Sequence, residues 1–259
     1  MQILQNTILI LLLASPLGAI AQEWQAKSTD HHTALLEMFV SEGCGLCPAA
    51  EHYVNHLPEK GITDDELIVL TFHIDYLNSK KGWVDKFAKP TFSERQIQLA
   101  HLNRYENIFT PELVVSGETV HSWEEQLIDV VGFLNHYKSE ADISLNIEQK
   151  TSDNLIVDVS LQLRGEENRE FSKLYLAVTE DDVFSEVRGG DNAGRDFNHQ
   201  NLVRTWLGPF DLATDGSTNI QQEISLADDW QQTSLTVVAV VQNLSDGYVL
   251  QALAVPLER

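Results

Sequence analysis

Apolar runs and helical patterns alternate over the first half of the chain. Residues 34–40 (ALLEMFV) and 66–76 (ELIVLTFHIDY) have the length and apolar content of buried strands. Residues 111–122 predict two short strands that turn at Ser116-Gly117. The segments that predict helices are 46–57, 91–105 and 123–138. From residue 34 the predicted order is therefore strand, helix, strand, helix, strand, strand, helix.

The pattern changes near residue 139. Alternating or β-branched runs follow one another, separated by polar turns such as SDN and SDG, with no long helical pattern between them. These runs are ISLNIEQ, LIVDVSLQL, KLYLAVTE, IQQEISL, SLTVVAVVQN and YVLQALAV. Regular short strands of this kind predict an antiparallel β-sandwich. We therefore expect one domain over residues 22–138 and a second over residues 139–259.

The first 21 residues have the composition of an export signal. The apolar run ILILLLASPLGAIA ends in the small-residue pattern Ala19-Ile20-Ala21, which predicts cleavage after Ala21. The run is shorter than the ~20 residues needed to cross a membrane, so we expect no stable membrane insertion after cleavage. The predicted location is periplasmic or secreted.

The charge of the chain narrows the range of its partners. Lys and Arg number 17 against 39 Asp and Glu, a formal net charge of −22, and both halves are acidic. DNA, RNA and anionic lipid surfaces repel such a protein. We therefore expect no nucleic-acid partner, whereas the oligomeric state does not follow from the sequence.

The chain has two cysteines, Cys44 and Cys47, where the first predicted strand passes into the first predicted helix. A disulfide between them closes a very short loop and restrains the unfolded chain little, so a structural bond is a weak explanation. The unpaired N–H groups and positive dipole end of a helix start favour a thiolate at Cys44. We expect Cys44 to attack, Cys47 to resolve the mixed disulfide, and the pair to form a disulfide in turn. Glu42 and the uncharged Gly45-Leu46 pair predict only a moderate lowering of the Cys44 pKa.

This position of a CxxC motif in the element order is that of a thioredoxin-like core. The predicted fold is an α/β thioredoxin-like domain followed by an all-β antiparallel sandwich, α+β overall. In such a core Thr110-Pro111 begins a strand that faces the cysteines through a cis proline, the alternative being an ordinary trans bond. Glu37, on the first strand, is either a buried carboxylate that relays protons to Cys47 or an exposed strand residue.

Metal binding is the rival explanation for the cysteines. His52 and His56 lie on one helix face, but both are too far along the predicted helix to share an ion with Cys44. The two cysteines with a distant histidine, His73 or His121, form a weaker alternative set for copper or zinc. No other cofactor is expected.

A polar-rich segment, residues 191–206, interrupts the strand pattern of the second half. Its Arg195, His199 and Arg204 are candidates for an anion or partner site. An ordinary loop that leads into a strand is the alternative, and we favour it.

Four ordered motifs resemble a known family: GCGLCP at 43–48, FHIDYLNSKKGW at 72–83, RQ at 95–96 and TP at 110–111. In these motifs the chain is similar to an uncharacterised family of secreted bacterial thioredoxin-like proteins. The resemblance spans about residues 34–117, and NLVR at 201–204 is also typical of the family. It implies a fold and export more than a reaction, because the family has no assigned activity.

The resemblance also implies which residues surround the cysteines. The residues expected to support the active site are Gly43, Pro48, Thr110 and Pro111. A second group, around the end of the second predicted strand, either lines an active cleft or locks the following loop against the core. That group is His73, Asp75, Tyr76, Trp83 and Asp85. The remaining motif positions are Gly82, Arg95 and Gln96.

Three functions are compatible with these observations. The leading hypothesis is an exported thiol–disulfide oxidoreductase that acts on protein thiols and disulfides or on small thiols. The second is a non-catalytic periplasmic binding or scaffold protein that uses the β-sandwich. The third is a copper or zinc chaperone that uses the CxxC motif. The direction of electron flow, the physiological substrate and the role of the second half do not follow from the sequence.

Overall fold

The structure, a computed structural model, describes residues 22–79 and 82–258, and the predicted export signal lies outside the described residues. The α-helices are α1 (Cys47–Asn55), α2 (Pro90–Leu102) and α3 (Trp123–Asn135). The first strands are β1 (Gln22–Lys27), β2 (Ala34–Val40), β3 (Leu67–His73), β4 (Glu112–Val115) and β5 (Glu118–Thr119). The later strands are β6 (Ala141–Thr151), β7 (Asn154–Leu163), β8 (Ser172–Glu180), β9 (Val183–Glu186), β10 (Asp196–His199), β11 (Leu202–Asp211), β12 (Ser217–Ser225), β13 (Leu235–Asn243) and β14 (Val249–Pro256). Short 3-10 turns are η1 (Pro58–Lys60), η2 (Gly190–Asn192) and η3 (Gln232–Ser234).

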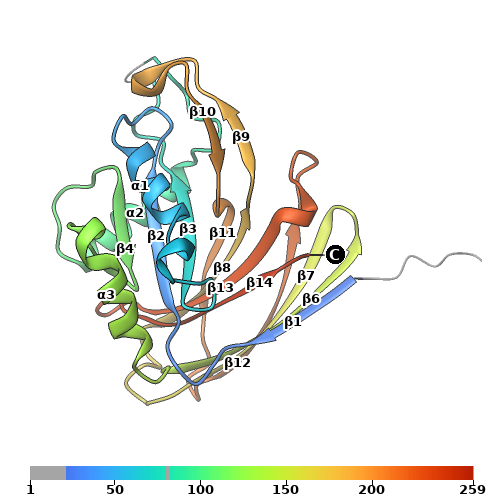
Figure 1. Cartoon of the computed structure of the whole chain (residues 1–259). Helices are drawn as coiled ribbons and strands as arrows, with labels where there is room; N and C mark the ends of the chain where they lie inside the picture. The colour runs from blue at the N-terminus through green and yellow to red at the C-terminus, as the bar shows by residue number, and fades with distance from the viewer. Residues whose placement is uncertain (1–21, 80–81, 259) are drawn as a thin grey trace, which may run out of the picture.

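One mixed sheet runs through both halves of the chain, in the order β14-β13-β8-β11-β3-β2-β4-β5 (Figure 1). Strand β3 pairs in parallel with β2 and with β11, and the other neighbours are antiparallel. Leu202 of β11 lies opposite Thr71 of β3, and the Thr71 N–H donates to the carbonyl oxygen of Asn201 at 2.9 Å. The β3–β11 contact is therefore the seam between the two halves.

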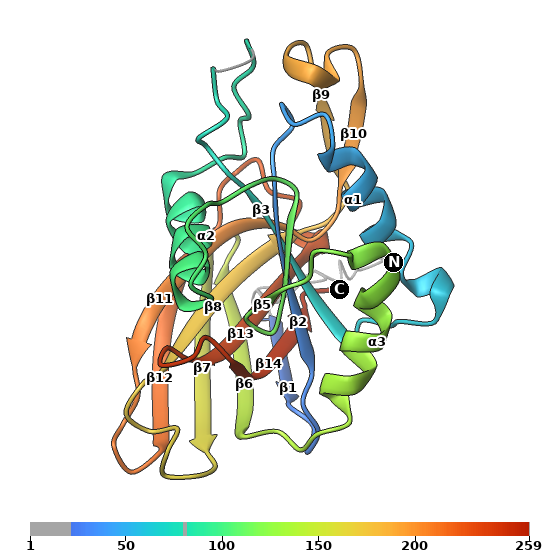
Figure 2. The same ribbon diagram turned by 90° about the vertical axis from the view of Figure 1, so that its left-hand side faces the viewer.

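The remaining strands form two smaller sheets. The order β1-β6-β7-β12 forms an antiparallel sheet, in which β1 pairs with β6 from Gln22 opposite Gln149 to Lys27 opposite Ser144. Strands β9 and β10 form a separate antiparallel pair. Figures 1 and 2 show this hairpin projecting beyond the mixed sheet, beside the start of α1.

The two-residue period of the strands gives each face of the mixed sheet its own core. Leu36 of β2 packs with buried residues of α1 and α3, whereas Phe39 of the same strand packs on the face that α2 covers. In β8, Tyr175 shares the α2-side core with Phe39, whereas Leu176 packs against the β1-β6-β7-β12 sheet. Helix α2 therefore covers one face. Helices α1 and α3 and the four-stranded sheet lie side by side over the other.

The predicted fold class is wrong. The chain does not form a self-contained thioredoxin-like α/β domain followed by a separate all-β sandwich. Strand β11 of the second half extends the sheet that holds β2 and β3, and β1 of the first half lies at the edge of the sheet that holds β6 and β7. The alternation of side chains along a strand shows which of its faces is buried. It does not show which neighbouring strand forms hydrogen bonds with its backbone. The result is a mostly β fold with mixed and antiparallel sheets.

The individual elements agree more closely with the sequence pattern. The strand predicted at 34–40 is β2, and Leu127 and Val131 of α3 are buried on the helix face that their spacing predicts. Helix α2 begins at Pro90 with Lys89 as its N-cap, one residue before the helix predicted at 91–105. The pattern did not predict β1, β9 or β10. Strand β10 and the first part of β11 lie in the polar segment 191–206, where the sequence predicted a loop that leads into a strand.

Candidate functional site

The two cysteines lie in the tight loop between β2 and α1. The Cys44 N–H donates to the Ser41 carbonyl at 3.0 Å, and the Cys47 N–H donates to the Cys44 carbonyl at 3.3 Å. Helix α1 begins at Cys47, and Pro48 occupies its first turn, where a missing N–H breaks no helix hydrogen bond. Both cysteines are free thiols, with Cys44 7 % exposed and Cys47 fully buried. The structure thus describes the reduced pair, with Cys44 the more accessible thiol.

The two thiols differ sharply in acidity. A hydrogen bond from the Cys47 thiol, together with the backbone N–H groups of Leu46 and Cys47, lowers the pKa of Cys44 to about 6. Burial raises the pKa of Cys47 well above its usual range, and the neighbouring Cys44 sulfur and the Glu51 carboxylate raise it further. At neutral pH the pair therefore holds a thiolate at Cys44 and a proton at Cys47.

The strand that follows α2 brings a proline beside the cysteines. The Thr110-Pro111 peptide bond is cis. Cys44 Sγ lies 3.7 Å from the carbonyl oxygen of Thr110, to which the thiol donates when it is protonated, although the two residues lie far apart in the sequence. The structure therefore joins the predicted Thr110 and Pro111 to the cysteine loop.

A buried acid–base group lies beneath the cysteine loop. His199, at the end of β10, donates from Nδ1 to Glu51 at 3.1 Å and from Nε2 to Glu42 at 3.3 Å. Burial alone lowers the pKa of His199, but the hydrogen bonds to the two carboxylates outweigh it and raise the pKa to about 9. Burial raises the pKa of Glu42, yet the hydrogen bonds from His199, Ser185 and Trp83 together outweigh this and the pKa is lowered. An imidazolium between two carboxylates is thus the state that this geometry favours.

A second buried pair adjoins this group. His73, at the end of β3, contacts Asp85 through Nδ1 at 2.7 Å, and both side chains are fully buried. The His73 ring lies 4.7 Å from the His199 ring, centroid to centroid. Asp85 also accepts the Glu42 N–H at 2.9 Å, and the Trp83 indole donates to Glu42 at 2.8 Å. Of the predicted cleft residues, His73, Trp83 and Asp85 therefore join one network with Glu42.

The other two predicted cleft residues lie toward α2. The Asp75 N–H donates to the hydroxyl of Ser93, on α2, at 3.1 Å. Tyr76 is partly buried, and burial raises its pKa although a hydrogen bond with Gln96 acts in the opposite direction. The Ser93 contact fixes Asp75 onto α2, whereas Tyr76 interacts both with Gln96 of α2 and, electrostatically, with Cys44 and Cys47.

The β9–β10 hairpin clamps the cysteine loop. The Asn192 side-chain amide donates to the carbonyl oxygens of Glu42 at 2.9 Å and of Cys44 at 2.8 Å. A Cβ built on Gly45 would lie 3.1 Å from Asp191 Cβ, and one on Gly190 would lie 3.1 Å from Gly43 Cα. Gly45 and Gly190 thus admit the close approach of the η2 turn to the cysteine loop.

Glu37 does not contact the cysteines. Its carboxylate accepts two hydrogen bonds of 2.7 Å from Arg95, and both side chains are 1 % exposed. Glu37 lies between Leu36 and Met38, which pack with Cys47, so its own side chain points to the opposite face of β2. The carboxylate beside Cys47 is instead Glu51, on α1 itself.

The histidines considered as metal ligands are engaged elsewhere. His73 contacts Asp85, and His121 stacks on Phe109 with ring centroids 6.0 Å apart. The His52 and His56 rings contact one another on α1, 4.0 Å apart. Over the described parts of the chain, no three His, Cys, Asp or Glu side chains group in a way that could hold a metal ion.

The polar segment 191–206 does not gather an anion site. Arg204 donates to the buried Glu180 at 2.6 Å, and His199 is bound between two carboxylates. Arg195 lies exposed in the hairpin. Sequence reasoning identified His199 only as part of this segment and missed Glu51 and Asn192, since no spacing rule links residues of α1 to a hairpin so distant along the chain.

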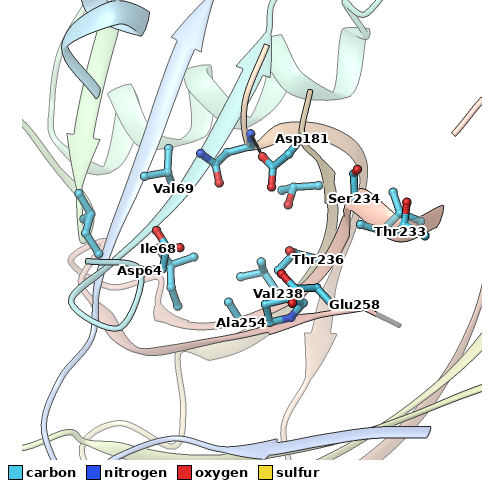
Figure 3. A pocket seen from close by; sticks show the side chains of 15 residues that line it. Asp64, Ile68, Val69, Asp181, Thr233, Ser234, Thr236, Val238, Ala254 and Glu258 are labelled. Atoms are coloured by element: carbon cyan, nitrogen blue, oxygen red, sulfur yellow. Dashed lines mark hydrogen bonds between the residues drawn. The ribbon is translucent and has the colours of Figure 1, made fainter. Parts of the chain in front are cut away.

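A cavity of about 150 Å³ lies at the other end of β3 (Figure 3). Its lining includes Asp64, Asp181, Thr236 and Glu258, with no cysteine or histidine among the described lining residues. Burial raises the pKa of Asp181. The cavity adjoins the first residues of β3, whereas His73 and the cysteine loop lie at its last, so the two features are separate.

The chain matches a protein family that has no assigned function. Residues 35–242 match the family described as "Protein of unknown function (DUF1223)". The chain belongs to this family. No curated protein is significantly similar to it. Among the described residues, none of the helices has the length and apolar character needed to cross a membrane.

Two solved structures share the fold of this DUF1223 protein. HBP35 of Porphyromonas gingivalis is 18 % identical with a TM-score of 0.67, and the match covers 88 % of this chain and 76 % of HBP35. A protein of Agrobacterium tumefaciens is 17 % identical with a TM-score of 0.57, and the match covers 88 % and 96 % of the two chains. At these identities the likeness concerns the fold alone.

Proposed function

We propose that the protein catalyses thiol–disulfide exchange through Cys44 and Cys47, outside the cytoplasm. The observation that carries the proposal is the pairing of a partly accessible Cys44 with a fully buried Cys47 across a helix start. The acidity of the two thiols supports it, because only a thiolate attacks a disulfide. The apolar run that ends at Ala21 supports export.

The exchange consists of two displacements at sulfur, in which bonds and electrons balance. In the reducing direction the Cys44 thiolate attacks a substrate disulfide, forms a Cys44–substrate bond and releases one substrate thiolate. Cys47 then loses its proton, bonds to the Cys44 sulfur and releases the second substrate thiolate. The two cysteines are oxidised by two electrons, the substrate disulfide is reduced by two, and the reverse sequence oxidises a dithiol.

The reduction potential of the pair tests the proposal. The full chain is equilibrated in glutathione redox buffers, trapped with an alkylating reagent and read by intact mass. A potential between about −120 and −270 mV, the range of known exchange proteins, supports catalysis. A potential below about −300 mV marks a resistant structural bond and refutes it.

Two serine variants give matched controls. Cys44→Ser removes the attacking thiolate and should abolish exchange. Cys47→Ser keeps the attack but cannot resolve, so it should accumulate a mixed disulfide that intact mass detects. Equal activity in both variants and the wild-type protein would refute the assignment of the two roles.

A further inference from the structure

We propose that Glu51 accepts the proton of Cys47 during resolution, with His199 as the residue that positions it. This inference rests on the exchange reaction proposed above. It concerns the second displacement only, in which a buried thiol must become a thiolate before it can attack.

Glu51 and Cys47 lie on the same helix, α1. The two residues lie four apart on α1, hence on one helix face, and both are buried. Glu51 Oε2 is bound to His199, whereas Glu51 Oε1 is buried without a hydrogen-bond partner. A buried oxygen without a partner is uncommon in proteins and leaves an acceptor available on this carboxylate.

The imidazole of His199 lies on the other oxygen of the Glu51 carboxylate. His199 holds Glu51 at 3.1 Å through Nδ1 and Glu42 at 3.3 Å through Nε2. This contact fixes the Glu51 carboxylate through Oε2 and leaves Oε1 as the oxygen available to accept a proton. The β9–β10 hairpin thereby delivers a functional group from the second half of the chain to the cysteine loop of the first half.

Aromatic rings and titratable groups surround His199. Phe87 and Phe197 flank its ring, with centroids 5.4 Å away in each case. The titratable or charged groups on the neighbouring elements are His73 on β3, Asp85 on the loop after β3, Glu42 before α1, and Glu51 and Cys47 on α1.

Proton and electron changes balance with these groups alone. The Cys47 thiol proton passes to Glu51, the Cys47 thiolate forms the bond to Cys44 Sγ, and the Cys44–substrate bond breaks. The released substrate thiolate is then reprotonated, and Glu51 returns its proton through solvent. No additional oxidant or reductant takes part beyond the substrate disulfide.

Two-step release from dithiobis(nitrobenzoate) tests the assignment on the reduced full-length protein. Attack by Cys44 releases the first coloured thiolate, and attack by Cys47 on the mixed disulfide releases the second. The rates of both releases are measured across pH for the wild-type protein and for Glu51→Gln. Glu59→Gln, which removes an exposed carboxylate just after the same helix, is the matched control.

The sign of the effect separates the two roles open to Glu51. As a proton acceptor, its loss slows the second release at neutral pH by at least about tenfold, since general acid–base catalysis contributes about 10²–10⁴. The first release stays near the wild-type rate, and the deficit closes at high pH where hydroxide removes the proton. If Glu51 acts only through its charge, its loss lowers the pKa of Cys47 and the second release becomes faster.

His199→Gln gives an independent readout if Glu51→Gln folds poorly. The loss of the cationic partner should move the pH profile of the second release without an equal change in the first. A second release from Glu51→Gln at or above the wild-type rate, or an unmoved profile in folded His199→Gln, overturns the role of Glu51. Absence of any second release from the wild-type protein instead overturns the exchange reaction itself.

Discussion

Replacing Arg95 by Met should destabilise the protein more than any single change in the cysteine loop. Arg95 makes two hydrogen bonds of 2.7 Å to Glu37 and lies over the rings of Tyr175 and Trp206, 5.0 and 5.1 Å from their centroids. Met retains the apolar stem but leaves the Glu37 carboxylate buried without a counter-charge. Breaking a buried pair in this way costs about 3–5 kcal/mol.

Urea unfolding followed by circular dichroism measures this loss directly. The double variant Glu37→Leu with Arg95→Met should recover most of the stability, because apolar groups of similar volume often replace a buried ion pair without loss. The acidity of Cys44 should not change in either variant, since Glu37 faces away from the cysteines. An Arg95→Met loss below about 1 kcal/mol, or a double variant no more stable than the single one, would refute the reasoning.

Three further predictions concern the thiols, the pH range of stability and a turn. Cys47→Ala should raise the pKa of Cys44 above about 6, because it removes the Cys47 hydrogen bond, the largest cause of the lowering; thiolate absorbance against pH checks this. His199 has a folded pKa raised from 6.5 to about 9, so its contribution to stability is full below pH 6.5 and is lost as pH rises through 9. At 1.36 kcal/mol per pH unit the loss is at most about 3 kcal/mol, visible in unfolding curves between those pH values and absent in His199→Gln. Gly117→Ala should lower the melting temperature, because Gly117 has φ +103° and an added Cβ would lie 2.0 Å from the Gly247 carbonyl oxygen; an unchanged melting temperature would contradict this.

The local elements were predictable because they depend on short-range patterns. The spacing of apolar residues identified β2 and α3, and the position of the CxxC motif placed Cys44 before a helix. The family motifs also identified His73, Trp83 and Asp85, which the structure joins through hydrogen bonds and contacts with Glu42 and His199.

The connections between the halves were not predictable in the same way. Pairing of β11 with β3 depends on backbone groups, which leave no trace in the side-chain pattern of either strand. Glu51 has the spacing of a buried helix position, but its role depends on His199, which only the tertiary fold brings within 3.1 Å. The sequence left Glu37 either near Cys47 or exposed, and it is neither, because strand position alone does not decide which face a charged residue occupies.

The seam at β3 has a consequence for the order in which the protein acquires its structure. Until β11 is synthesised and docks, the edge of β3 that Leu202 and Asn201 occupy presents unpaired backbone N–H and C=O groups. Strand β1 likewise has no partner until β6 is synthesised, because Gln22 pairs with Gln149, far along the chain. Such non-local pairing slows folding and leaves an open strand edge on the nascent chain, the kind of edge at which one chain adds to another. The first half of this protein is therefore protected from self-association only when the second half has arrived.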